Sequence, residues 1–314
     1  MWRFSFFRSL GLMARTWPFL LLQVLLHAGI VALHLALITA GAGLGQILGL
    51  VFDPQFLDVA MMLGGAAGAG LAALLIHQRR ARILHELTAA HLAAMVTLLE
   101  GGTLPAGRAQ IGAARALVAA RFPDPAALLR LEGLLRRAMD AALELLHGLT
   151  RRLIQTTLVS QLLVLLRATL RFLAGPASLV IIAQALRPST GEPWAAARQG
   201  LILYAQNIGA MMRNRLVLLP PTVLLVVGSF ALLLAPSVAI ARAMPGDWSG
   251  GGLFLAMFLA WAVKRALMDP FNRACLLQVF LRHPAGPAPD ALWLAHMERD
   301  SPAFRELSAP REKG

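Results

Sequence analysis

Residues 17–40 read WPFLLLQVLLHAGIVALHLALITA and contain no charged side chain. An α-helix rises about 1.5 Å per residue, so roughly 20 apolar residues cross a hydrocarbon core about 30 Å thick. Residues 216–241 meet the same condition, and residues 59–76 just reach it. Residues 252–281 begin with twelve uncharged residues before Lys264. These four segments predict an all-α polytopic membrane protein.

The composition also favours a membrane protein. The chain is 58% hydrophobic and 14% charged, whereas soluble domains carry roughly 25% charged residues. The formal charge of +13 is not accompanied by an aromatic-basic cluster or a groove-reading motif, so we expect no nucleic-acid partner. We expect membrane lipids with anionic headgroups as partners instead. The chain has 27 arginines and two lysines, which hints at a GC-rich bacterium and hence a bacterial inner membrane.

Basic and acidic residues alternate along the chain and predict its orientation. Residues 1–16 hold three arginines and no acid, and residues 41–58 hold two aspartates and no basic residue. Residues 77–152 hold eleven arginines against six acids. Because segments rich in Lys and Arg stay in the cytoplasm, residues 77–152 and both termini are predicted to be cytoplasmic, and residues 41–58 to lie outside.

The segments divide the chain into four regions. We expect an interfacial helix with the first two spans in residues 1–76, cytoplasmic helices in 77–152, a C-terminal membrane region in 153–281, and a soluble, partly disordered tail in 282–314. Gly-Gly at 101–102 and Asp-Pro at 124–125 predict helix boundaries. Residues 153–186 are apolar but have basic residues on both sides. They are therefore expected to form a re-entrant or hairpin segment, with a single full crossing as the alternative.

Apolar residues recur every three or four positions before the first span. They are Trp2, Phe6, Leu10, Met13 and Trp17, and they fall on one side of a helix opposite Arg8 and Arg15. This pattern predicts a short amphipathic helix that lies in the membrane interface with its aromatic side toward the lipid. A simple aromatic and basic anchor for the first span is the alternative.

The second span is rich in glycine, at positions 64, 65, 68 and 70. Small residues at four-residue spacing let two helix backbones approach closely. We therefore expect Gly64, Gly65, Gly68 and Gly70 to form a packing face. The partner is either another span or another subunit in a homo- or hetero-oligomer, and a solute path along this face is the less favoured interpretation.

The last apolar segment contains a polar cluster: Lys264, Arg265, Asp269, Asn272 and Arg273. Asp269 is four residues from both Arg265 and Arg273, so its carboxylate can pair with either on a helix. Asp269 is also the one acidic residue within the four apolar segments. Charges at this depth are costly unless they are paired or hydrated. The cluster is therefore a candidate solute path or gate, or a structural ion-pair cluster that closes the inner end of the bundle.

A second polar stripe lies in the first span, where Gln23, His27 and His34 fall within about 40° of one helix face. The two histidines are about 10.5 Å apart along the axis, too far to chelate one ion. Hydrogen bonding between helices is the favoured interpretation, and a protonation relay is the alternative. We expect no metal, no cofactor and no enzyme activity. His85 and His91 are six residues apart rather than the four of a zinc-protease helix.

Three short motifs resemble the C-terminal region of the choline transporter-like family. Residues 166–175 read LRATLRFLAG, residues 212–214 read MRN before an apolar span, and residues 268–271 read MDPF with Cys275 following. The resemblance covers residues 166–281 and implies a helical-bundle solute transporter for choline-like organic cations. That family has more spans and a large extracellular loop, so the substrate is not carried over.

Two functions from different classes follow from these observations. The first is an accessory or scaffold component of a membrane complex, which would dock through the glycine-rich span and the cytoplasmic helices. The second is a transporter of small organic cations or lipid-related solutes, built around Asp269. No internal repeat that would mark inverted transporter halves is visible in the sequence, which favours the accessory component.

Overall fold

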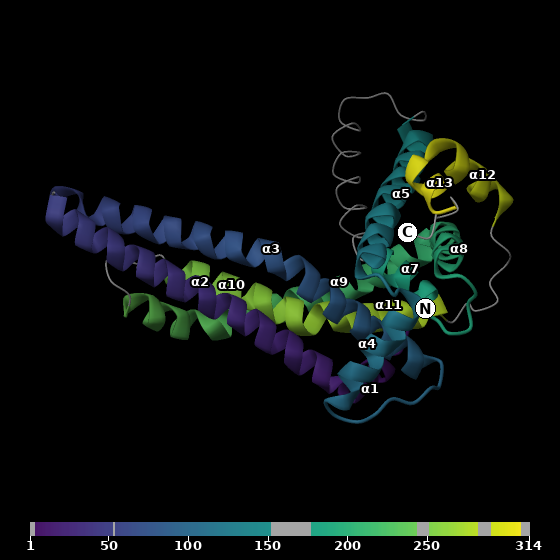
Figure 1. Ribbon diagram of the computed structural model, residues 1–314, viewed down its shortest axis with the longest axis horizontal. Helices are drawn as coiled ribbons and strands as arrows, with labels where there is room; N and C mark the ends of the chain where they lie inside the picture. Colours follow the sequence, from purple (N-terminus) through teal and green to yellow (C-terminus); the bar gives the residue numbers. More distant parts are fainter. Residues whose placement is uncertain (1–3, 53, 152–176, 244–250, 282–289, 309–314) are drawn as a thin grey trace. The chain divides into compact units, whose positions relative to one another are not determined.

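The computed structural model describes residues 4–52, 54–151, 177–243, 251–281 and 290–308 (Figure 1). All regular elements in these ranges are helical. Four of them are long and apolar enough to cross a membrane: Trp17–Phe52, Pro54–Ile76, Ile208–Arg242 and Gly251–Leu281. The prediction of an all-α multi-pass membrane protein with four spans is therefore confirmed.

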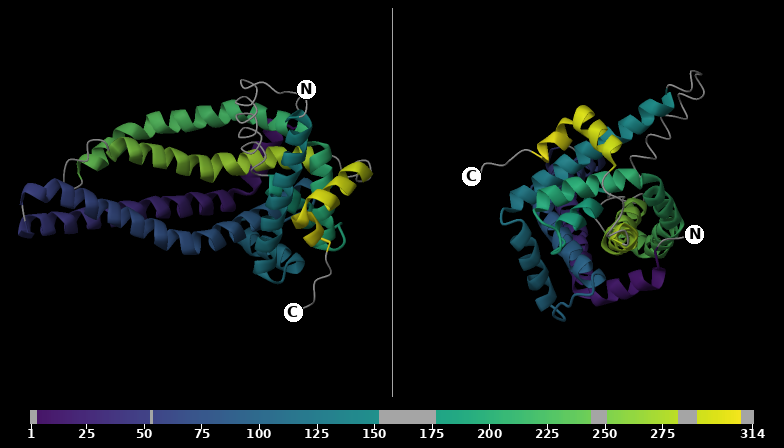
Figure 2. Two further views of the ribbon diagram at one scale, coloured as in Figure 1. Left: turned by 90° about the horizontal axis from the view of Figure 1, so that it is seen from above. Right: turned by 90° about the vertical axis from the view of Figure 1, so that its right-hand side faces the viewer.

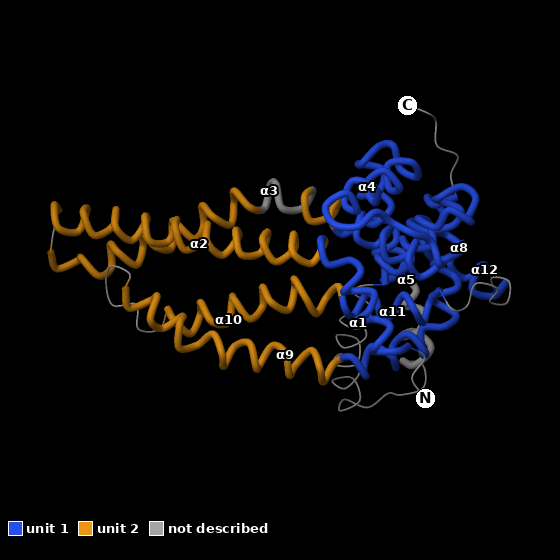
Figure 3. Tube along the Cα trace, turned by 90° about the horizontal axis from the view of Figure 1, so that it is seen from below, with its two compact units in different colours: residues 1–18, 88–218, 271–314 blue, residues 19–87, 219–270 orange. Residues whose placement is uncertain are grey.

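The chain divides into two compact units (Figure 3). Unit 1 contains residues 1–18, 88–218 and 271–314, and unit 2 contains residues 19–87 and 219–270. The polar stripe and the glycine-rich span lie in unit 2, whereas the predicted cytoplasmic helices lie mainly in unit 1. Each unit is described separately below.

Unit 2 consists of two long helical hairpins (Figure 2). Its elements come from α2 (Trp17–Phe52), the short η1 (Pro54–Phe56), α3 (Leu57–Leu99), α9 (Ile208–Arg242), α10 (Gly251–Val263) and a π-helical turn (Lys264–Met268). In the first hairpin α2 packs along α3, and in the second α9 packs along α10. Val31 of α2 packs with Leu255 and Ala262 of α10 in a small apolar core.

Two helices of unit 2 are longer than the sequence predicted. Residues 41–58 were expected to be an outside loop, but α2 continues to Phe52 and α3 begins at Leu57. Residues 77–152 were expected to form cytoplasmic helices separate from the second span, but α3 runs from that span without interruption to Leu99. The physical reason is that no proline occurs before position 54 in α2 after Pro18, and neither glycine nor proline occurs between positions 70 and 101.

Unit 1 is built from shorter helices around a buried centre. They are α1 (Phe6–Arg15), α4 (Ala109–Arg121), α5 (Pro125–Arg151), α7 (Ala177–Ala185), α8 (Pro193–Gln206), α11 (Asp269–Leu281), α12 (Ala291–Asp300) and α13 (Pro302–Glu306). The predicted boundaries in this region are confirmed. Gly101 ends α3 with φ of 87°, and the Asp124 carboxylate accepts a hydrogen bond from Ala126 N at 2.8 Å at the start of α5.

Helix α7 is the second limb of the segment that was expected to enter and leave the membrane. It is enclosed by protein, since Ile181 and Ala183 have no exposed surface and Ile182 is 1% exposed. A helix that is apolar all round is buried on all sides, and α7 packs against α8 and α5. The first limb, residues 153–176, lies outside the described residues.

The described part of the C-terminal tail contains two short helices. Residues 291–306 form α12 and α13, and Met297 and Phe304 are fully buried in unit 1. The Arg198 guanidinium lies 4.9 Å from the centre of the Phe304 ring and forms an ion pair with Glu298. Two buried side chains and helix caps at Asp290 and Ser301 therefore stabilise α12 and α13.

Candidate functional site

The predicted polar cluster begins at a π-helical turn, Lys264–Met268, between α10 and α11. The backbone N–H of Asp269 donates to the carbonyl of Lys264, five residues earlier. Pro270 explains this geometry, because a proline ring in a regular α-helix clashes with the carbonyl of the residue four positions before it. A π-helical turn is wider than an α-helical one and so relieves this clash. Turns of this kind are rare in proteins overall, and those that occur are often found at functional sites.

Asp269 forms ion pairs with two cations from the turn. Lys264 Nζ lies 2.8 Å from Oδ1, and Arg265 Nη1 lies 3.1 Å from Oδ2. The Arg265 pair was predicted from its four-residue spacing. The Lys264 pair was missed, because five residues correspond to about 140° around a regular α-helix. The π-helical turn brings both cations to the carboxylate.

The other two residues of the predicted cluster lie in unit 1. Arg273 is 6% exposed, and its charge acts on His91, a fully buried histidine of α3. Burial, and secondly the nearby Arg273 charge, hold the pKa of His91 well below its ordinary value. Asn272 is half-buried. The structure therefore brings Lys264, Arg265 and Asp269 together in unit 2 and assigns Asn272 and Arg273 to the other unit.

The predicted polar stripe faces α10. The Nδ1–H groups of His27 and His34 donate to the carbonyls of Gln23 and Ile30, each at 2.8 Å. Because a carbonyl only accepts, these bonds place a proton on Nδ1 of each ring. Gln23 and His27 are 3% and 5% exposed, and His34 is half-buried.

Two aromatic residues of α10 connect the stripe to the charged cluster. The His27 ring lies edge-on to Trp261 at 6.3 Å, and the His34 ring lies edge-on to Phe258 at 5.1 Å. Phe258 and Trp261 stack at 5.8 Å, and the Arg265 guanidinium lies 5.3 Å from the Trp261 ring. We call the polar stripe, these two aromatic residues and the Lys264–Arg265–Asp269 group together the polar column. Sequence reasoning missed Phe258 and Trp261, although Trp261 precedes Arg265 by four residues, the spacing of neighbours on a helix.

The polar column is a packed contact between α2 and α10 in which the charges compensate one another. Its one carboxylate has two cationic partners, and its two histidines donate to their own helix. Within the described ranges no group of three or more His, Cys, Asp or Glu side chains could hold a metal ion. The arrangement supplies two cations, one anion and stacked rings, and it joins α2 to α10.

The glycine-rich face of α3 packs against α2. A Cβ added at Gly64 would lie 2.1 Å from the carbonyl oxygen of Gly41, and one at Gly68 would lie 2.0 Å from that of Leu37. Gly65 is buried, whereas a Cβ at Gly70 would meet no atom within 4 Å. For Gly64 and Gly68 the partner is therefore another span of the same chain.

Half of this contact was missed in the sequence. Glycines also recur at positions 41, 45 and 49 of α2, and a Cβ at Gly45 would lie 2.0 Å from the carbonyl oxygen of Ala60. Four-residue spacing was the signal, but these positions had been taken as a loop. We call the contact formed by Gly41, Gly45, Gly64 and Gly68 the glycine seam.

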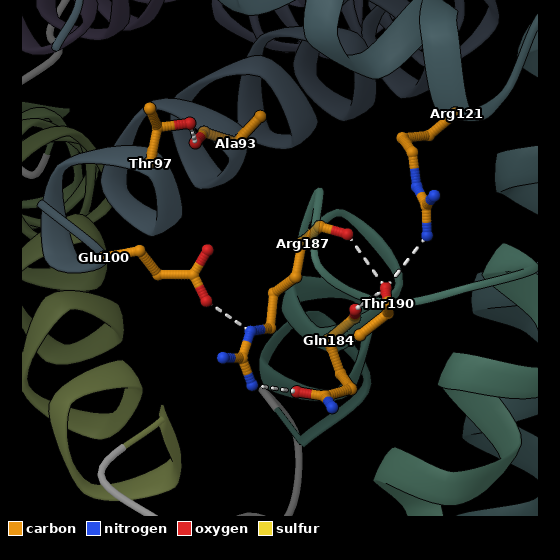
Figure 4. A network of polar contacts seen from close by, with 7 residues as sticks. All are labelled: Ala93, Thr97, Glu100, Arg121, Gln184, Arg187 and Thr190. Carbon is orange, nitrogen blue, oxygen red and sulfur yellow. Dashed lines mark hydrogen bonds and ion pairs between the residues drawn. The ribbon is translucent and has the colours of Figure 1, made fainter. Parts of the chain in front are cut away.

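A second polar network fixes the loop between α7 and α8 within unit 1 (Figure 4). Arg187 donates to Glu100 at the end of α3 and, at 3.1 Å, to the Gln184 side chain of α7. Arg121 of α4 donates to Thr190 Oγ1 at 2.9 Å and to the carbonyl at the end of α7. Gln184 and Arg187 are three residues apart, but the Arg121 bonds and the Arg187–Glu100 bond join residues 64 to 87 positions apart, so no spacing rule could have predicted those contacts.

Comparison with protein-family models, with curated proteins and with solved structures gave no match to this chain.

Proposed function

We propose that this chain is a non-catalytic accessory or scaffold component of a membrane complex in a bacterial inner membrane, with both termini in the cytoplasm. The observation that carries the proposal is the internal compensation of Asp269 by Lys264 and Arg265. A solute or proton site needs a charge that can exchange partners, whereas a structural ion pair is held by neighbours on its own helix.

Two further features support a structural role. The glycine seam brings α2 and α3 to backbone contact, which favours a rigid hairpin rather than a moving gate. The histidines of the polar column donate to carbonyls of their own helix and pack on aromatic rings. These contacts use the polar groups of unit 2 to join helices.

The second candidate is a transporter of small organic cations, which the resemblance to choline transporter-like proteins suggested. The π-helical turn beside Asp269 and the stacked Phe258 and Trp261 rings favour it, because aromatic faces attract cations. The Trp261 ring, however, already has the Arg265 guanidinium beside it. A transported cation would have to displace that contact.

The substitution Asp269→Asn separates the two candidates. In the scaffold, it leaves Lys264 and Arg265 without a counter-charge, and the free energy of unfolding should fall by about 1–3 kcal/mol. This is less than for a fully buried pair, because Lys264 and Arg265 are 29% and 47% exposed. The double variant with Lys264→Gln should lose less than the sum of the single losses.

Choline uptake into liposomes containing the purified protein is the second measurement. We expect no uptake above that of empty liposomes for the parent chain. Uptake by the parent chain, lost in an Asp269→Asn variant of unchanged melting temperature, would replace the scaffold proposal with the transporter. Unchanged stability without uptake would remove the structural role assigned to Asp269.

A further inference from the structure

We propose that α1, together with Trp17 at the start of α2, binds the surface of an anionic phospholipid bilayer through an exposed set of side chains, Phe7, Arg8, Leu10, Arg15 and Trp17. We call these five residues the lipid face. All of them lie in unit 1 and are exposed. The face differs from the one that the sequence predicted, because Met13 is 7% exposed and Phe6 stacks on Phe271 at 5.9 Å.

The opposite side of α1 is fixed to protein. The Gln278 side-chain amide donates to Ser9 Oγ at 2.6 Å, and Ser9 Oγ lies 3.1 Å from Cys275 Sγ. Thr16, which follows the helix, donates to the Leu12 carbonyl at 2.9 Å and so accepts from His91 Nε2 at 3.0 Å. These contacts hold α1 at one rotation about its axis, and the lipid face is therefore a permanent feature of the surface.

The lipid face is amphipathic. Phe7 and Leu10 are 85% and 54% exposed, and at 100° per residue they lie about 60° apart on α1. Trp17, the first residue of α2, is 51% exposed. Arg15 and Arg8 lie about 80° and 100° from Phe7 around the helix, on the side away from Leu10. Large apolar side chains flanked by arginines are typical of helices that lie in the membrane interface, where the cations reach the headgroups.

Charge and position indicate that lipid, rather than a protein, covers this face. Neither Arg8 nor Arg15 has an ion-pair partner among the described residues, and no acidic residue precedes Asp53 in the chain. The membrane span α2 begins at Trp17, one residue after the end of α1. The face is thus adjacent in the chain to a membrane span, and lipid phosphate groups complement its two cations.

Spin labels at single cysteines test the proposal in the full chain. Labels at Phe7→Cys and Leu10→Cys should be more accessible to oxygen than to a water-soluble nickel chelate in vesicles of phosphatidylcholine and phosphatidylglycerol. Leu292→Cys is the matched control, since Leu292 is an apolar residue, 72% exposed, on another helix of unit 1. It should show the reverse preference. The parent chain gives the labelling blank, because its one cysteine, Cys275, is buried.

A label at Leu44→Cys in α2 reports whether the span itself is in lipid. If that label is in lipid while positions 7 and 10 behave like position 292, the lipid face is refuted and the membrane span stands. Labels at 7 and 10 that neither reagent reaches would show a protein partner instead and would also overturn the proposal.

The charge contribution is tested by Arg8→Gln with Arg15→Gln. Raising the phosphatidylglycerol content should move the labels at positions 7 and 10 deeper in the parent chain, and this shift should be lost in the double variant. Both arginines are exposed, so the melting temperature should not change. A shift that persists in the double variant would refute recognition of the anionic headgroups.

Discussion

The substitution Gly45→Ala measures how closely α2 and α3 approach in the glycine seam. A Cβ at position 45 would lie 2.0 Å from the carbonyl oxygen of Ala60 and 2.6 Å from its carbonyl carbon, and both are backbone atoms. Real Cβ atoms essentially never come within 3.0 Å of another heavy atom. The two backbones must therefore move apart by at least about 1 Å, because no side chain can rotate to relieve the clash.

The expected cost follows from that displacement. Overpacking of this kind destabilises a well-packed contact by about 1–3 kcal/mol. Gly43→Ala is the matched control on the same helix, because a Cβ there would meet no atom within 4 Å. Replacing an unhindered helical glycine by alanine gains about 0.5–1 kcal/mol. The two variants should therefore differ in free energy of unfolding by about 1.5–4 kcal/mol.

Reversible unfolding of both variants in one detergent gives this difference directly. The Gly45→Ala protein should unfold at a lower temperature than the parent, and Gly43→Ala at the same or a higher temperature. Equal stability of the two variants would show that the helices are not in backbone contact at Ala60. The reasoning about the glycine seam would then be wrong.

Three further predictions concern titration and orientation. The pKa of His91 lies below that of an unfolded histidine, so the unfolded chain binds more protons and stability should fall as the pH drops below about 6.5. His91→Gln should flatten this dependence of the melting temperature, and an unchanged slope would contradict it. Burial raises the pKa of Tyr204, the one tyrosine of the chain, to about 12. Its absorbance should therefore titrate near that pH when folded and near about 10 when unfolded, with stability lost between the two, and one common value would refute the burial. Reporter fusions at Asp53 and at the C-terminus should lie on opposite sides of the membrane, and reporters on the same side would contradict the proposed orientation.

The long elements were predictable because their signals are local. Apolar runs located the four spans, and Asp124 and Gly101 marked helix boundaries through capping and backbone conformation. The extension of α2 was missed because glycines at positions 41, 43, 45 and 49 suggest a loop in isolation. They are tolerated in a helix here because α3 packs against three of them.

The details of the site depended on information that periodicity does not contain. The spacing of Asp269 from Arg265 predicted one ion pair, but the pairing with Lys264 depends on the π-helical turn before Pro270. The sequence pattern predicted a lipid-facing side of α1 with Phe6 and Met13, whereas the exposed side contains Phe7 and Leu10. A helical pattern cannot distinguish side chains that face lipid, such as Phe7, from those that face protein, such as Met13.

The contacts of α1 also constrain the order in which the chain can fold during synthesis. The glycine seam joins residues close in sequence, so the α2–α3 hairpin can form as soon as both helices have left the ribosome. By contrast, Ser9 and Ser5 bond to Cys275 and Gln278, which follow them by 266 and 273 residues. Helix α1 must therefore wait for α11 to be translated, and unit 1 cannot close until that later helix has been made.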